Sequence, residues 1–237
     1  MPPEVPQYFV IATILTAFLF LSVVWFMCHR AIYSLNFTKN KKPLYSFLIL
    51  ASLIIWFALV LFLSKPGFYV INPLVAPNIM LGFLFLFIVL QKVYASEKVK
   101  IIADAIPIPW IVGIQFYRIV GYGFIILWQM NLLPAAFAFS AGIGDMIVGF
   151  AAPFVAALYF FKKSYSKNLV KFWNILGIAD LVIAYSIGIL GYSRPFQVLP
   201  LAPSTEILSL YPLALIPLFA VPLALLLHFL SIRALKS

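Results

Sequence analysis

Charged residues are scarce in this sequence. They make up 9% of its 237 residues, whereas hydrophobic residues make up 65%. An ordinary soluble domain is about 25% charged. The mean hydropathy of +1.11 is correspondingly high. This composition excludes an ordinary soluble globular domain and indicates an integral membrane protein, whose surroundings are the lipid bilayer.

Cysteine and histidine are almost absent as well. The single Cys28 excludes an internal disulfide framework, and no cluster of Cys and His has the spacing of metal ligands. We therefore expect neither a metal site nor a cofactor. Haem is the alternative, because His29 and His228 fall near the inner ends of the first and last apolar segments and could ligate an iron axially. The same two side chains could equally face the membrane interface.

No basic residue precedes the first apolar run. The N-terminal residues MPPEVPQ contain Glu4 but neither Lys nor Arg. A cleaved secretory signal begins with a positively charged segment. We therefore expect the first helix to be retained in the protein.

Apolar segments recur along the whole chain, and each is long enough to cross a bilayer, which takes about 20 residues. The sequence predicts an all-α integral membrane protein, a seven-helix transmembrane bundle that forms a single domain over residues 1–237. The connections are too short to fold as separate domains. The predicted spans are approximately 8–28, 44–64, 73–90, 106–128, 134–161, 169–190 and 207–231.

Basic residues collect on one side of these spans. Of the 16 Lys and Arg, all except Lys65, Arg194 and Arg118 fall in or beside the first, third and fifth loops or at the C-terminus. Cytoplasmic loops carry such an excess. The sequence therefore predicts an outside N-terminus and a cytoplasmic C-terminus, in a bacterial cytoplasmic (inner) membrane. The net charge of +10 reflects this bias, so we expect no nucleic-acid partner.

Three ionisable residues lie deep inside predicted spans: Arg118, Asp145 and Asp180. Because a helix rises 1.5 Å per residue, all three fall near the membrane midplane. An ionised group there costs about 3 kcal/mol, and such residues are usually functional. We expect the three to meet inside the bundle, with Arg118 pairing one carboxylate and the other in surplus. Gln115 and Asn174 could extend a polar track toward the cytoplasm, or simply join helices.

A short pattern recurs on two neighbouring spans. Residues 142–149, GIGDMIVG, match residues 177–184, GIADLVIA, in the positions of the aspartate and of the small residues. Such a pair can form the core of an inverted repeat, which in transporters places the binding site at the midplane. Small residues at this spacing also permit close helix packing without any repeat.

The segment GIGD at 142–145 resembles the Gly-x-Gly-Asp motif of intramembrane aspartyl proteases such as presenilin and signal peptide peptidase. In that family the aspartate is one of a catalytic pair that shares a proton, so the resemblance implies a catalytic role for Asp145. The sequence departs from the family elsewhere. Their partner aspartate follows a tyrosine on the preceding span, whereas here Asp104 follows Ala103 at a membrane edge and Asp180 lies downstream.

Four segments together resemble an uncharacterised family of small bacterial membrane proteins. They are QFYRIVGYG, GIGD, WNILGIADLVIA and YPLALIPLFAVPLALLLHFLSIRAL, all in the second half of the chain. This resemblance implies no activity. The seven-span layout also resembles microbial rhodopsins, but the last span has no lysine for retinal before Lys236.

The midplane charges lead us to expect a small proton- or cation-linked transporter of a small ion or small molecule. Arg118 would hold an anionic group or one aspartate, while Asp145 and Asp180 would titrate or coordinate. The alternative is a non-catalytic membrane subunit or scaffold, in a homo-oligomer or with a complex partner, in which the charges only fix helix packing. The intramembrane protease is a third alternative.

Overall fold

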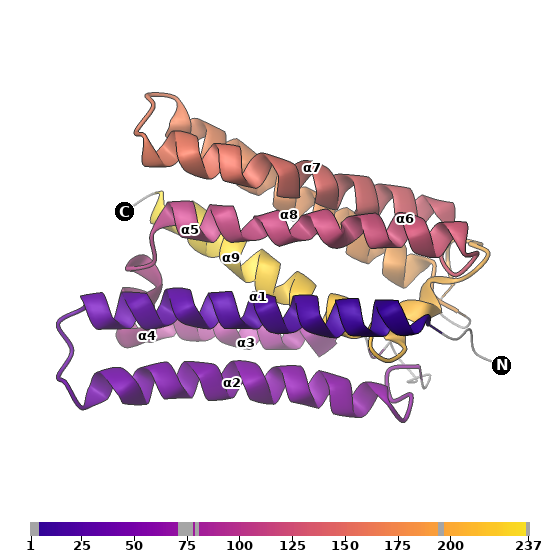
Figure 1. Cartoon of the computed structure of the whole chain (residues 1–237), viewed down its shortest axis with the longest axis horizontal. Coiled ribbons are helices and arrows are strands. Elements are labelled where there is room, and N and C mark those ends of the chain that lie inside the picture. Colours follow the sequence, from indigo (N-terminus) through magenta and orange to yellow (C-terminus); the bar gives the residue numbers. More distant parts are fainter. Residues whose placement is uncertain (1–4, 71–77, 79–80, 194–196, 236–237) are drawn as a thin grey trace.

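The computed structural model of this chain describes residues 5–70, 78, 81–193 and 197–235. This described part is all-helical and contains no strand. The long helices run side by side, with α7 and α8 at one side of the molecule and α2 at the other (Figure 1). Six helices in the described part are long and apolar enough to cross a membrane. The chain therefore has the architecture of a multi-pass membrane protein.

The first half of the chain begins with two long regular helices. α1 spans Gln7–Ser34 and α2 spans Lys41–Ser64. α3 spans Leu81–Ala95, and the short helix α4, Glu97–Asp104, follows in the stretch that the sequence indicates to be a basic loop. Two of the six candidate spans are thus α1 and α2.

The predicted third span, 73–90, lies partly outside the described residues, which omit 71–77 and 79–80. Its described part belongs to α3, whose apolar portion Leu81–Lys92 is shorter than the six candidate spans. A seventh membrane span therefore stays a prediction.

The fourth predicted span, 106–128, is a helix with an irregular middle. α5, Ile108–Gly113, and α6, Tyr122–Gln129, are joined by η2, a 3₁₀ helix over Ile114–Gly121. Runs of 3₁₀ helix longer than a few residues are uncommon, and inside a helix they often mark a strained or functional segment. This segment carries Arg118.

α7, Ala135–Phe160, and α8, Ser166–Leu190, follow as neighbouring helices that run in opposite directions. Their bounds lie within three residues of the fifth and sixth predicted spans. The indole N–H of Trp173 on α8 donates to the carbonyl oxygen of Val148 on α7 at 3.1 Å. A buried hydrogen bond of this kind fixes how the two helices face each other.

The last span is broken, whereas the sequence predicts one kinked helix over 207–231. The short 3₁₀ helix η3, Thr205–Ser209, is followed by turns and then by η4, a π-helical segment over Ile216–Ala220. Only then does α9, Val221–Ala234, begin. The continuous part of this span therefore starts about four turns after the predicted start, and it ends three residues later.

Proline accounts for this break. Pro217 and Pro222 have no backbone N–H, so the carbonyls of Leu213 and Leu218 lose the donor that an α-helix would provide. The Leu213 carbonyl accepts instead from the N–H of Ile216 at 2.9 Å. Irregular backbone at membrane depth is tolerated where it is buried in protein or lines a cavity. The last span is the most buried of the six candidate spans, as this rule requires.

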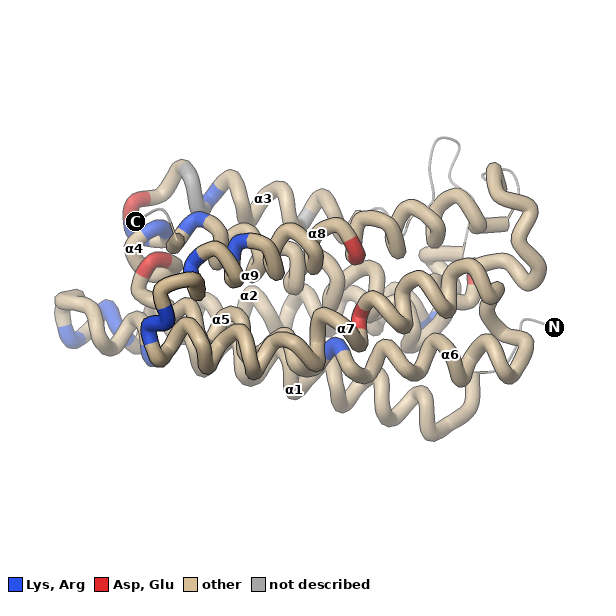
Figure 2. The backbone as a smooth tube through the Cα atoms, turned by 90° about the horizontal axis from the view of Figure 1, so that it is seen from above, with Lys and Arg blue, Asp and Glu red and all other residues tan. Residues whose placement is uncertain are grey.

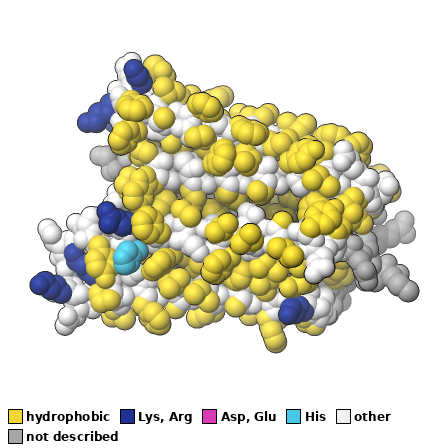
Figure 3. Space-filling view, viewed as in Figure 1, with side chains coloured by type: hydrophobic (Ala, Val, Ile, Leu, Met, Phe, Trp, Pro, Cys, Tyr) yellow, Lys and Arg dark blue, Asp and Glu magenta, His cyan; other side chains and the backbone are white. Residues whose placement is uncertain are grey.

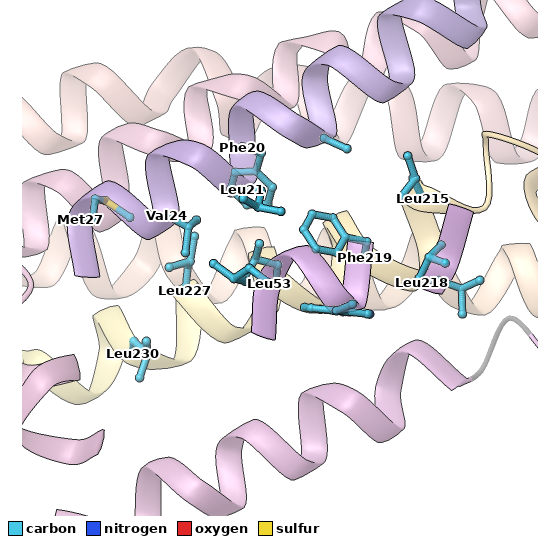
Figure 4. Close-up of a cluster of buried hydrophobic side chains, with 14 of the residues drawn as sticks. Phe20, Leu21, Val24, Met27, Leu53, Leu215, Leu218, Phe219, Leu227 and Leu230 are labelled. Atoms are coloured by element: carbon cyan, nitrogen blue, oxygen red, sulfur yellow. The ribbon is translucent and has the colours of Figure 1, made fainter. Parts of the chain in front are cut away.

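A large hydrophobic cluster joins α1 and α2 to the last span (Figure 4). Leu21 of α1, Leu53 of α2 and Phe219 of η4 are all buried in it. The ring centroid of Phe219 lies 4.7 Å from that of Trp56 on α2. Apolar contacts therefore hold α1 and α2 against the broken span.

Charged residues lie mostly at the ends of the bundle. Lys and Arg gather at the end where the C-terminus lies (Figure 2), and the face in Figure 3 is covered largely by hydrophobic side chains. Two basic residues on which the predicted orientation depends, Arg194 and Lys236, lie outside the described residues. The apolar exterior suits a lipid environment.

Candidate functional site

Arg118 lies in the interior of the bundle, with 1% of its side chain exposed. A buried guanidinium needs hydrogen-bond acceptors. Its Nε donates to Oδ1 of Asp145 on α7 at 2.7 Å, and its Nη2 donates to Oδ2 of Asp180 on α8. The predicted meeting of the three charges is therefore confirmed. The expectation that Arg118 pairs only one aspartate is wrong, because η2 enters between α7 and α8 and gives each carboxylate its own guanidinium nitrogen.

The third guanidinium nitrogen reaches His228 on α9. Nη1 of Arg118 lies 3.2 Å from Nε2 of His228 and 3.5 Å from the carbonyl oxygen of Gly177. Arginine can only donate, so Nε2 accepts and the imidazole proton sits on Nδ1. That Nδ1–H donates to Oδ1 of Asn174 at 2.9 Å. The contacts therefore define a neutral imidazole with one tautomer.

Asn174 carries this hydrogen-bonded chain further. Its Nδ2 donates to Oγ of Ser231 at 2.9 Å and to the carbonyl oxygen of Val170 at 2.8 Å. Asn174, His228 and Ser231 are all fully buried. Asn174 is therefore joined to the charged cluster, with His228 between it and Arg118.

Gln115 does not join this chain. Its Nε2 donates to the carbonyl oxygen of Ala224 on α9 at 3.2 Å, and its Oε1 is buried without a hydrogen-bond partner in the described structure. Gln115 thus links η2 to α9 beside the cluster rather than extending it.

His228 is a cluster residue that the sequence analysis missed. It was placed at the inner end of the last span, whereas the break in that span puts it near the middle of the continuous helical part. The available signal was the spacing of His228 and Ser231, three residues apart on an otherwise apolar helix, which places both on one face.

The two histidines have different hydrogen-bond partners in different parts of the bundle. Nδ1 of His29 lies 2.8 Å from Oγ of Ser46, between α1 and α2. Both ring nitrogens of His228 are engaged by protein groups. Within the described residues no group of three or more His, Cys, Asp and Glu side chains gathers as metal ligands would.

The contacts of Asp145, Asp180 and Asp104 can be compared with those of the catalytic aspartate pair in intramembrane proteases. Asp145 and Asp180 are bridged by Arg118, whereas an aspartyl dyad shares a proton directly. Asp104, the aspartate on the preceding segment, accepts from Nη2 of Arg233 at 2.9 Å at the end of the bundle. Neither Asp145 with Asp180 nor Asp145 with Asp104 therefore has the arrangement of a catalytic dyad.

Glycines let the helices approach closely enough for these contacts. A Cβ on Gly144 of α7 would overlap the carboxylate of Asp180, and a Cβ on Gly177 of α8 would overlap the ring of His228. Both positions therefore need the absence of a side chain to admit a polar group from the neighbouring helix.

The two copies of the short pattern play unequal parts. In the first copy, Gly144 makes room for Asp180. Ala179, at the matching position of the second copy, is exposed. The small residue thus serves close helix packing at Gly144 alone, without a symmetric use of the pattern.

A cavity of about 150 Å³ lies beside the cluster. Arg118 and Asp145 line it, together with Thr13 and Thr16 of α1. The rest of its wall is mainly apolar and comes from α1, η2, α6, α8 and the irregular part of the last span. A second cavity of about 40 Å³ also reaches Asp145, on the side of Tyr185. Asp145 therefore borders both cavities, and residues of the π-helical segment η4 line both as well.

The charges of the cluster determine which kind of ion it would attract. Every nitrogen of Arg118 already donates to a protein group. With both aspartates ionised and His228 neutral, the cluster has a formal charge of −1. In a low-dielectric interior an uncompensated negative charge favours uptake of a proton or a cation. These bonds use four of the five N–H groups of Arg118 and leave one on Nη2.

Residues 75–236 match the model of a protein family described as a domain of unknown function, DUF8737. The chain belongs to this family. The DUF8737 match includes all residues of the charged cluster and its hydrogen-bonded extension, while α1 and α2 precede it. It agrees with the resemblance of the second half of the chain to an uncharacterised family. No curated protein and no solved structure matches the chain.

Proposed function

We propose that this DUF8737 protein is a small proton- or cation-linked transporter, and that Arg118, Asp145 and Asp180 form its ion-binding site. The observation that carries the proposal is the sharing of one buried guanidinium by two carboxylates beside a cavity. Neutralisation of the surplus charge weakens the hold of Arg118 on one carboxylate, because a protonated carboxyl attracts a guanidinium less strongly. Binding of a proton or cation can thus be coupled to helix movement.

Two irregular helices next to the cavity support this function. η2 is a 3₁₀ segment and η4 is a π-helical segment, and both supply lining residues. The hydroxyl of Tyr117 on η2 lies 3.5 Å from the carbonyl oxygen of Ala220 on η4. Transporter sites are typically formed by discontinuous helices whose unwound backbone faces the substrate. Such segments change conformation more readily than regular helices.

The proposal includes seven spans, an outside N-terminus and a bacterial cytoplasmic membrane. The gathering of Lys and Arg at the C-terminal end supports this orientation. Single cysteines introduced into a Cys28→Ser background test it. A membrane-impermeant maleimide added to intact cells should label a cysteine at Asn131 and leave one at Lys163 unlabelled. The reverse pattern would invert the orientation.

A flux assay tests the function. Proteoliposomes that contain a pH-sensitive or a cation-sensitive dye, placed under a gradient of Na⁺, K⁺ or H⁺, should show a protein-dependent change in internal pH or internal cation concentration. Asp180→Asn should abolish the change, since it removes one carboxylate of the site. Asp104→Asn, which alters a partly exposed aspartate at the end of the bundle, is the matched control and should leave it intact.

A membrane subunit or scaffold is the second candidate. The dense packing of Gly144 and Gly177 against the cluster favours it, because the same contacts would fix helix positions in a static assembly. This candidate predicts no flux, loss of folding in each charge variant, and co-purification of a fixed partner.

A further inference from the structure

We infer that the cavity of about 150 Å³ is the substrate site and takes a small organic cation, a primary ammonium with an apolar body no larger than a benzene ring. This inference rests on the proposed function and names the substrate class for the same site. The ammonium would lie against Asp145, and the apolar body would lie among the side chains of α1, α6 and the last span.

The size of the cavity sets the size of the ligand. An apolar cavity of roughly 150 Å³ is large enough for benzene. Four- to six-carbon bodies are therefore the matching class.

The charge next to the cavity sets the sign of the ligand. Asp145 lines the cavity, and the cluster to which it belongs has a formal charge of −1 when both aspartates are ionised. The guanidinium of Arg118 also lines the cavity, but its nitrogens already donate to Asp145, Asp180, His228 and the Gly177 carbonyl. An anion would therefore find only one N–H group of Arg118, on Nη2, outside these hydrogen bonds, whereas a cation completes the charge balance of two ionised aspartates.

The cavity wall distinguishes an organic cation from an inorganic one. Side-chain oxygens in the wall come from Asp145, Thr13, Thr16 and Tyr117, and the other side chains except Arg118 are apolar. A bare metal cation needs six or more oxygen ligands to replace its water. An ammonium needs about three acceptors, which the carboxylate and the threonine hydroxyls can provide.

Aromatic rings add to this recognition. Phe9, Tyr117 and Phe124 all line the cavity, and they come from α1, η2 and α6. Ring faces attract cations and also cover apolar chains. The same wall therefore suits both ends of an alkylammonium.

Binding of n-butylammonium by the full-length protein in detergent tests the inference, with the unfolding temperature as the readout. At about 100 times its dissociation constant, n-butylammonium should raise the unfolding temperature by about 5 °C or more. Butanol and butyrate test the need for the positive charge, and tetrabutylammonium tests the size limit. None of these three should produce a comparable rise.

Two variants locate the binding. Thr16→Phe places a ring in the cavity and should abolish the n-butylammonium shift, whereas Ser52→Phe, on the exposed side of α2, should retain it. Asp145→Asn should weaken n-butylammonium at least roughly 10-fold, because it removes the charged acceptor. If Asp145→Asn does not fold, the comparison of Thr16→Phe with Ser52→Phe still tests whether n-butylammonium binds in the cavity.

Two results would overturn the inference. One is a shift from butanol equal to that from n-butylammonium, and the other is a full shift in Thr16→Phe. Either result, together with Asp180-dependent flux of H⁺ or an inorganic cation in proteoliposomes, would leave the proposed transport intact and remove only the substrate class. Absence of flux under every gradient would instead contradict the transport function itself.

Discussion

The two ends of the chain build different kinds of helix packing. α1 and α2 are regular helices that meet the last span through apolar side chains, as in Figure 4. η2, α7, α8 and α9 meet instead through an arginine, two aspartates and a histidine, with glycines that admit them. Backbone irregularity is found next to this second group. Irregular backbone thus borders both groups, because η2 carries Arg118 while η4 places Phe219 in the apolar cluster, and α1 lines the cavity beside them.

Removal of Arg118 should have the largest effect on this comparison. Arg118→Gln leaves two buried carboxylates without their cation, which should lower the free energy of unfolding by about 3–5 kcal/mol. Arg233→Gln is the matched control at the end of the bundle, where its partner Asp104 is partly exposed, and should cost at most about 1 kcal/mol. Denaturant unfolding in mixed micelles measures both. Equal losses would mean that the central cluster is no more important than a surface pair.

A methyl group on Gly144 should have the next largest effect. Gly144→Ala would force the α7 backbone away from Asp180 and should cost about 1–3 kcal/mol. Gly113→Ala is the control, because its nearest neighbour would be Cβ of Ala156 at 3.8 Å. That substitution should be neutral or stabilise by up to about 1 kcal/mol. The same unfolding measurement separates them, and a tolerated Gly144→Ala would contradict the close packing described for α7 and α8.

Loss of the His228 side chain should have a smaller effect. His228→Leu leaves Oδ1 of Asn174 without its buried donor and leaves Nη1 of Arg118 with only the Gly177 carbonyl, at a cost of about 1.5 kcal/mol. His29→Leu, which removes a contact with Ser46 between α1 and α2, should cost less. A larger loss of unfolding free energy in His29→Leu than in His228→Leu would mean that the polar contact between α1 and α2 stabilises the protein more than the contact of His228 with the cluster.

The helices and the three central charges could be predicted from the sequence for identifiable reasons. Charged residues are so rare that Arg118, Asp145 and Asp180 stand out, and the fixed rise of a helix turns their positions into a depth. Their meeting is confirmed. The sharing of Arg118 by both aspartates could not be predicted, because it depends on how η2 enters between α7 and α8.

The last span shows where sequence patterns stop being informative. Hydropathy measures apolar length and does not distinguish a helix from buried turns of the same composition. The segment before Ile216 is apolar and yet mostly not α-helical, because Pro212 within it and Pro217 just after it lack a backbone N–H. The helix also ends at Ala234 rather than at 231, so His228 lies deeper than predicted, where it contacts Arg118.

Replacement of a cavity hydroxyl should have the smallest effect on stability. Thr13→Val keeps the shape of the side chain and should change the free energy of unfolding by less than about 0.5 kcal/mol. It should nevertheless weaken n-butylammonium several-fold, because one acceptor for the ammonium is lost. The unfolding temperature with and without n-butylammonium measures both quantities. Unchanged affinity would mean that α1 only closes the cavity and takes no part in recognition.

The most direct test of the ion-binding claim is the unfolding temperature across pH and a panel of monovalent cations. Wild type, Asp180→Asn and the control Asp104→Asn are compared as purified full-length proteins. A site that binds a proton or cation must raise stability by mass action. The account predicts a proton- or cation-dependent shift in wild type and Asp104→Asn that disappears in Asp180→Asn. A flat response in all three, with Asp180→Asn merely less stable, would contradict it and leave the cluster a structural one.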